Sequence, residues 1–328
     1  MMAHRIAQDA KLRRHLFRVL QVFVVLLTLG FVARTLVHNW SGVRALEFQP
    51  QWLSLGAALV LAVLYFVARG ALWHLIVRRI VGRYSLKLDV ACWLGSSLGK
   101  YVPGKVLLVL GRVYVYRRLG ASASSVGVAF VLEMAALFIA APLLFAWALL
   151  TTDLPAGPQL RVSVLLTALS ALAAAHPRVL GVLLRLGARW SRSASQMDLP
   201  ALRWWDTLGD VARMVACWLV LGVGFWLLSR SLVQLPFAAV AELTAAYALA
   251  GVAGIAVLVA PSGVGVRESI LTLLLAPLIG PGTAAALALL ARLWMTLAEV
   301  GSALVGMWWL RRHPPAALAN GASVASGA

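Results

Sequence analysis

The chain has 328 residues, of which 62% are hydrophobic and only 12% are charged. Soluble domains carry about 25% charged residues, so this composition excludes an ordinary soluble protein. The net charge of +18 would suit nucleic acid, but the basic residues flank apolar runs, as the positive-inside rule requires. We therefore predict an all-α, polytopic membrane protein whose partner is membrane lipid and not nucleic acid.

The N-terminal segment, residues 1–18, is basic and precedes an apolar run at residues 19–38. That run is too long for a signal-peptide core, and no A-x-A cleavage site follows it. We expect residues 1–18 to be cytoplasmic and the run to be a retained first span.

Further apolar runs reach the ~20 residues that cross a bilayer. They predict spans at 51–77, 123–150, 160–176, 207–230 and 283–310. The basic connection 178–206 has apolar residues at helical spacing, which favours an interfacial amphipathic helix. The tail 313–328 is small and polar enough to be disordered. Residues 19–312 are thus expected to form one integral-membrane domain.

Two apolar segments, residues 88–119 and 235–281, are interrupted by proline followed closely by glycine. The breaks are at Pro103, Gly104, Pro261, Gly263 and Gly265. Backbone freed by such a break must be buried in protein or line a wet cavity. We interpret both segments as re-entrant helical hairpins entering from opposite faces, an inverted repeat of the kind used by transporters. Two full crossings within 235–281 are the alternative, so the predicted number of spans is about six to eight.

Ionisable residues gather at these hairpins and in the spans that follow them. The cations are Lys100, Lys105, Arg112, Arg267 and Arg292, and the carboxylates are Glu133, Glu268 and Glu299. Charges at membrane depth are costly, so a functional role is the default interpretation. Five cations against three carboxylates leaves an excess of two positive charges, which suits a phosphate-bearing headgroup. Simpler interpretations are snorkelling of Lys100 and Arg112 to the interface, and a structural Glu133–Arg292 ion pair.

Catalysis would need an Asp/Glu cluster with metal spacing or a histidine near a nucleophile, and the sequence has neither. The cysteines Cys92 and Cys217 lie in apolar sequence without a Cys/His cluster, so no metal or disulfide is predicted. No motif pairs His74 with a partner, and Tyr114 and Tyr116 are expected to be interface anchors. We expect no catalytic residue and no cofactor.

The segment KYVPGKVLLVLGR, followed by an intramembrane Glu133, and the segment PSGVGVRE carry a family resemblance. Over about residues 15–312 the chain resembles the lysylphosphatidylglycerol synthase transmembrane-region family. PSGVGVRE is similar to a P-G-G-x-G-x-R-E pattern, with Ser262 at the first glycine position. In the bacterial multiple peptide resistance factor, this region is the flippase half, which moves aminoacylated phosphatidylglycerol between leaflets. The resemblance implies a flippase-like protein of the bacterial inner membrane.

Only 16 residues follow Arg312, so we do not expect the soluble lysyltransferase domain of the full-length synthases. The leading hypothesis is a translocase for an anionic phospholipid or a lipid-linked headgroup. Lys100, Lys105, Arg112, Arg267 and Arg292 would hold phosphate, and Glu133, Glu268 and Glu299 would hold these cations or receive an amine. The alternative is a non-catalytic membrane partner of a glycosyltransferase, or an enzyme acting on polyprenyl-phosphate lipids.

Overall fold

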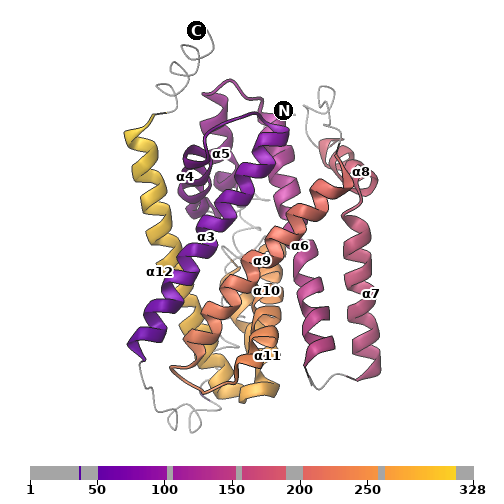
Figure 1. Ribbon diagram of the computed structural model, residues 1–328, viewed down its shortest axis with the longest axis vertical. Helices are drawn as coiled ribbons and strands as arrows, with labels where there is room; N and C mark the ends of the chain where they lie inside the picture. Colours follow the sequence, from indigo (N-terminus) through magenta and orange to yellow (C-terminus); the bar gives the residue numbers. More distant parts are fainter. Residues whose placement is uncertain are drawn as a thin grey trace, which may run out of the picture.

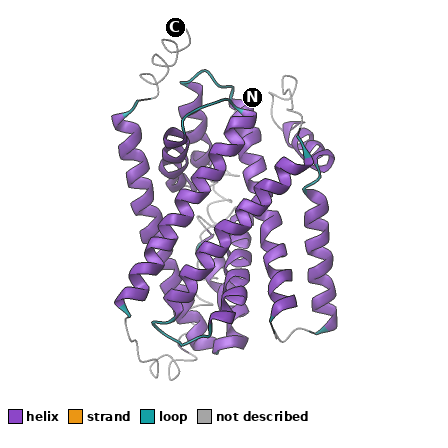
Figure 2. Cartoon of the chain, viewed as in Figure 1, coloured by secondary structure: helices purple, strands orange, loops and turns teal. Residues whose placement is uncertain are grey.

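The computed structural model describes Val37 and residues 51–101, 106–152, 157–189, 202–257 and 263–314. Within these ranges every regular element is helical and no strand occurs (Figure 2). The helices long and apolar enough to cross a membrane are α3 (Trp52–Ile80), α6 (Ala123–Thr151), α9 (Trp204–Ser229), the combined stretch Phe237–Ala256 and α12 (Pro281–Arg312). This confirms the predicted polytopic helical membrane fold. The predicted segments 1–18 and 19–38 and most of the tail lie outside the described residues.

The first broken segment forms hairpin one, made of α4 (Leu86–Ser96), the 3-10 helix η1 (Ser97–Tyr101) and α5 (Val106–Arg117). The second forms hairpin two, made of η3 (Phe237–Ala239), α10 (Val240–Ala256) and α11 (Val266–Ile279). Figure 1 shows hairpin one entering from the upper end of the bundle and returning there, whereas hairpin two enters from the lower end. The stretch Phe237–Ala256 is long enough to cross but is one arm of a hairpin, so the predicted inverted arrangement holds.

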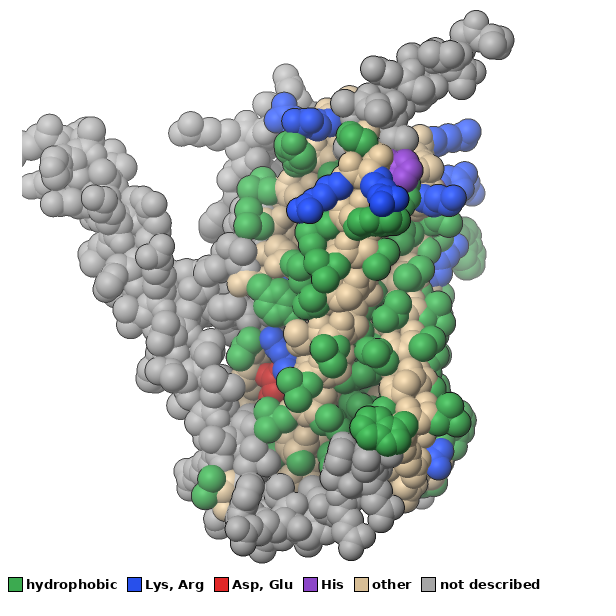
Figure 3. Space-filling view, turned by 90° about the vertical axis from the view of Figure 1, so that its left-hand side faces the viewer, with side chains coloured by type: hydrophobic (Ala, Val, Ile, Leu, Met, Phe, Trp, Pro, Cys, Tyr) green, Lys and Arg blue, Asp and Glu red, His purple; other side chains and the backbone are tan. Residues whose placement is uncertain are grey.

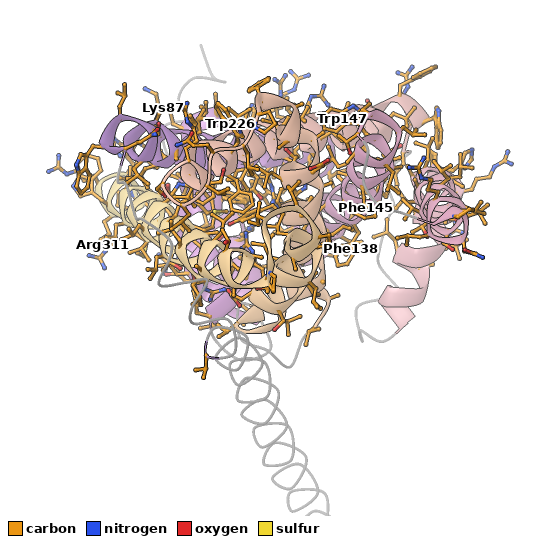
Figure 4. The ribbon with its side chains drawn as sticks, turned by 90° about the horizontal axis from the view of Figure 1, so that it is seen from below. Lys87, Phe138, Phe145, Trp147, Trp226 and Arg311 are labelled. Carbon is orange, nitrogen blue, oxygen red and sulfur yellow. The ribbon has the colours of Figure 1, made fainter. Side chains whose placement is uncertain are left out.

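The remaining helices are α7 (Pro158–Ala174) and α8 (Pro177–Arg189). Viewed from below, both lie to one side of the bundle (Figure 4). Leu180 and Leu184 of α8 are buried, whereas Arg178 and Arg185 are exposed. The amphipathic helix predicted in the connection 178–206 is therefore present as α8.

Basic residues are distributed unequally between the two ends of the bundle. One end carries Arg78, Arg79, Arg83, Lys87, Arg117, Arg118, Arg178, Arg185, Arg203, Arg311 and Arg312, and the other carries Arg161 and Arg230. Figure 3 shows the same contrast on one face, with blue side chains gathered near the top over a largely hydrophobic wall. We call the first end the basic end. Hairpin one enters from it.

Helix α3 packs against α4, α6, α9 and α12. Because lipid tails are as apolar as leucine, close packing and polar contacts hold such helices together instead of the hydrophobic effect. Small residues permit this packing: a Cβ built on Gly306 of α12 would lie 2.8 Å from the carbonyl oxygen of Ala91 in α4. Hairpin one is thus clamped between α3 and α12.

Candidate functional site

A cavity of about 640 Å³ lies where the two hairpins, α3, α6, α9 and α12 meet. Its charged lining residues are Arg69, Lys100, Arg112, Arg267, Glu133 and Glu299. Four cations face two carboxylates, which leaves an excess of two positive charges in the described lining. The apolar part of the lining comes mainly from α5 and α6, with Leu108, Val109, Leu110, Phe130, Met134, Leu137 and Phe138. The cavity therefore combines buried charged groups with a large apolar lining.

Glu133 is the centre of the first charged cluster and is completely buried. Its two oxygens accept from Arg69 at 2.6 Å and from Arg112 at 2.5 Å. The indole Nε1 of Trp93 also donates to it, at 2.8 Å. Charge-assisted bonds of this length are stronger than neutral ones. This cluster joins α3, both arms of hairpin one and α6 through one carboxylate.

The two arginines of this cluster are held by aromatic rings as well. The Arg112 guanidinium lies 4.3 Å from the ring centroid of Trp73, and its Nε donates to Ser96. Arg69 donates to the hydroxyl of Tyr65. Arg112 is only 2% exposed, so the simpler interpretation that it snorkels to the interface is wrong. The alternative of a structural Glu133–Arg292 pair is also wrong, because Arg69 and Arg112 occupy this carboxylate.

Arg69 was not among the predicted site residues. A single arginine in the apolar run 51–77 was the available signal, because a charge within a span indicates function. Its partner lies 64 residues away in sequence, so no local pattern identifies the pair.

The second charged cluster is centred on Glu299 of α12. The Nζ of Lys100 lies 2.6 Å from Glu299 Oε1, and the Tyr101 hydroxyl donates to Oε2 at 2.9 Å. Lys100 faces the cavity and pairs there, instead of snorkelling to the interface. These contacts link the end of η1 in hairpin one to α12.

In hairpin two, the part of the PSGVGVRE motif from Gly263 onward forms the start of α11. Gly265 has φ +81° and precedes α11, and its N–H donates to Glu268 Oε2 at 2.6 Å. Glu268 thus caps the helix, and its other oxygen lies 3.3 Å from Arg292. Neither Glu268 nor Arg292 lines the cavity. These two predicted site residues support the start of α11 from outside the cavity lining.

Gly263 brings the start of α11 close to α10. It has φ +66°, and a Cβ built there would lie 2.6 Å from the Cα of Gly254. Arg267 then faces the cavity with its guanidinium 4.3 Å from the ring centroid of Tyr247. Within the described part of the chain, no carboxylate forms an ion pair with Arg267. Arg267 also lies in the first turn of α11, where the helix dipole favours an anion.

Lys105, Pro103, Gly104 and Pro261 lie outside the described residues. Among the residues that are described, no group of three or more His, Cys, Asp or Glu side chains could hold a metal ion. The cysteines Cys92 and Cys217 are both buried and free.

A further buried polar group connects α3 to hairpin one. His74 Nδ1 lies 2.6 Å from Asp89 Oδ2, and Tyr116 donates to Asp89 Oδ1 at 2.6 Å. Trp73 Nε1 donates to the Tyr116 hydroxyl. Tyr116 is completely buried, so its expected role as an interface anchor is wrong. The sequence offered no signal for this group, because its members come from three helices.

The family model that describes the lysylphosphatidylglycerol synthase TM region matches residues 18–300 of the chain. The chain belongs to this family. No curated protein matches the chain. Family membership indicates a lipid-related role in the membrane, which agrees with a cavity whose lining combines an excess of cations with many apolar side chains.

Proposed function

We propose that this family member is a translocase that moves an anionic phospholipid, or a lipid-linked headgroup with a phosphate, across the bilayer. The observation that carries the proposal is Arg267. It is a cation in an intramembrane cavity, stacked on Tyr247 and without a carboxylate partner among the described residues. An unpaired charge at such depth is costly, and a ligand phosphate would supply the missing partner.

The net charge of the cavity favours one phosphate group. Glu133 is saturated by Arg69 and Arg112, and Glu299 is held by Lys100. The excess of two positive charges therefore matches a phosphate that carries one or two negative charges. Arg267 would bind the phosphate, and Lys100, Arg112 and Arg69 are the further cations of the lining.

The apolar lining favours a lipid over a soluble anion. Leu110 of α5 is 51% exposed and Phe138 of α6, which Figure 4 labels, is 39% exposed, yet both also line the cavity. Through an opening lined by such apolar side chains, lipid tails would stay in the hydrocarbon while the headgroup enters the cavity.

The two hairpins would open the cavity alternately toward opposite leaflets, as expected for inverted repeats with a midplane site. The Lys100–Glu299 pair would break and reform as hairpin one moves relative to α12. In this proposal the basic end is cytoplasmic by the positive-inside rule, the N-terminus is cytoplasmic, and the membrane is the bacterial inner membrane. The proposed activity is transport without covalent chemistry.

The test is leaflet-resolved transfer of fluorescent phosphatidylglycerol in proteoliposomes, with Arg267→Ala beside the wild type. Losing a charge-assisted phosphate contact of about 1.5–3 kcal/mol corresponds to a loss of transfer of roughly 10- to 100-fold. Arg230→Ala is the matched control, because Arg230 also stacks on an aromatic ring, Trp226 at 5.3 Å, but lies outside the cavity lining.

Arg230→Ala is expected to transfer lipid at the wild-type rate. Transfer that survives Arg267→Ala unchanged would remove Arg267 from the mechanism. Absence of transfer by folded wild-type protein, with any anionic lipid, would refute the translocase. It would favour the non-catalytic partner of a glycosyltransferase, for which co-purification is the direct assay.

A further inference from the structure

We propose that His74 and Asp89 form a proton-binding site whose occupancy controls hairpin one. The part of this inference that concerns lipid movement rests on the proposed translocase. In such a translocase, the proton exchanged at this site would couple lipid transfer to a pH difference across the membrane.

His74 and Asp89 are arranged as a buried pair that can hold one proton between them. The side chain of Asp89 is completely buried, and that of His74 is 11% exposed. Both carboxylate oxygens of Asp89 are occupied, one by His74 and one by the Tyr116 hydroxyl. No guanidinium or ammonium group among the described residues pairs with Asp89. The histidine is therefore the group that can balance the charge of this carboxylate.

Histidine is the side chain that ordinarily changes charge between about pH 5 and 8. A protonated His74 and an ionised Asp89 form a neutral pair, which is tolerated in a buried position. Loss of that proton leaves Asp89 as an uncompensated buried charge, a situation that is strongly destabilising. Release of the proton therefore favours separation of α4 from α3, which admits water to the carboxylate.

Other ionisable groups near this site do not replace the histidine. Tyr84 lies beside Tyr116, with ring centroids 5.3 Å apart, and Cys92 follows Asp89 by one turn of α4. Both are neutral near pH 7 in their ordinary state. On the surrounding helices, Arg79, Lys100 and Arg112 are engaged in the pairs Arg79–Asp210, Lys100–Glu299 and Arg112–Glu133. The side chains of Arg78, Lys87, Arg117 and Arg118 are exposed at the basic end.

The pair is placed between the solution and the cavity. His74 lies six residues before Ile80, the end of α3 at the basic end, or about 9 Å along the helix axis. From Asp89, contacts run through Tyr116 to Trp73, whose ring lies 4.3 Å from the Arg112 guanidinium in the cavity lining. The proton would enter from the basic end, and its effect would reach the cavity through the packing of Trp73 on Arg112.

The first experiment measures transfer of fluorescent phosphatidylglycerol in proteoliposomes, at equal pH and with one pH unit across the membrane. One proton per lipid would shift the final leaflet ratio up to about tenfold. His74→Gln and Asp89→Asn should abolish that shift and retain transfer at equal pH. His313→Gln is the matched control, because His313 is exposed at the same end and contacts only its own helix among the described residues. If the pH difference shifts the leaflet ratio in His74→Gln as much as in the wild type, the proposed coupling is refuted.

The second experiment does not depend on lipid transfer. The chain has six histidines, so ¹⁵N-histidine NMR with His74→Gln assigns the His74 signal. That signal should change with pH between the protonated and the neutral imidazole, and Asp89→Asn should move the midpoint of the change. A His74 signal that shows no such change, or a midpoint that Asp89→Asn leaves unmoved, would refute the proton site. Titration in a protein that transfers no lipid would refute the translocase alone and leave the site as a switch on hairpin one.

Discussion

Hairpin one and hairpin two have the same plan but opposite charge. In hairpin one the cation Arg112 lies on the hairpin, and its carboxylate Glu133 lies on the following long helix, α6. In hairpin two the carboxylate Glu268 lies on the hairpin, and the cation Arg292 lies on the following long helix, α12. Each half thus locks its hairpin to the next helix with an ion pair. Both halves therefore have an ion pair between hairpin and following helix, but the hairpin carries the cation in one half and the carboxylate in the other.

The reversed polarity has a consequence for the cavity. Hairpin one places Arg112 and Lys100 in pairs with Glu133 and Glu299. Hairpin two uses Glu268 for its lock and its helix cap, and Arg267 is left to face the cavity beside Tyr247. Hairpin two therefore presents the cation for a ligand, whereas hairpin one is held by α3, α6 and α12.

The largest loss of stability is expected when the ion pairs of Glu133 that hold hairpin one are removed. Glu133→Gln leaves Arg69 and Arg112 buried without their carboxylate, which should cost about 3–5 kcal/mol of stability. Glu268→Gln should cost less, because Arg292 is 19% exposed and its contact with Glu268 is longer, at 3.3 Å. Thermal unfolding of the two variants in detergent measures the difference. Equal losses would mean that the two locks are equivalent.

A smaller effect is expected at the glycine contact within hairpin two. Gly263→Ala combines a left-handed φ, which costs about 1–2 kcal/mol for other residues, with a clash against Gly254. Gly120→Ala is the matched control, because Gly120 has φ +86° but open space around a built Cβ. The thermal stability of Gly263→Ala should fall further than that of Gly120→Ala. The same loss in both variants would show that the close approach of α10 and α11 contributes nothing.

The smallest effect is expected at the ring that supports Arg267. Tyr247→Leu removes a cation–π contact worth about 0.5–2 kcal/mol, which corresponds to a roughly 2- to 30-fold loss of lipid transfer. Tyr247→Phe keeps the ring and should transfer lipid at nearly the wild-type rate. An equal loss of transfer in both variants would assign the effect to the tyrosine hydroxyl and not to the ring.

The sequence by itself determined the membrane class, the positions of most helices and the two hairpins. These features follow from local information, because apolar run length, Pro-Gly breaks and flanking basic residues act within one segment. It also identified Lys100, Arg112, Glu133, Arg267 and Glu299, since a charge within an apolar run is conspicuous wherever it lies.

Only the tertiary structure decided which charges meet. Arg69 pairs with Glu133, His74 with Asp89, and Arg292 with Glu268. Glu268 therefore supports α11 and does not line the cavity, and Tyr116 is a buried partner of Asp89 instead of an interface anchor. The physical reason is that an ion pair depends on which faces of different helices pack together, and the spacing of residues along one helix does not contain that information.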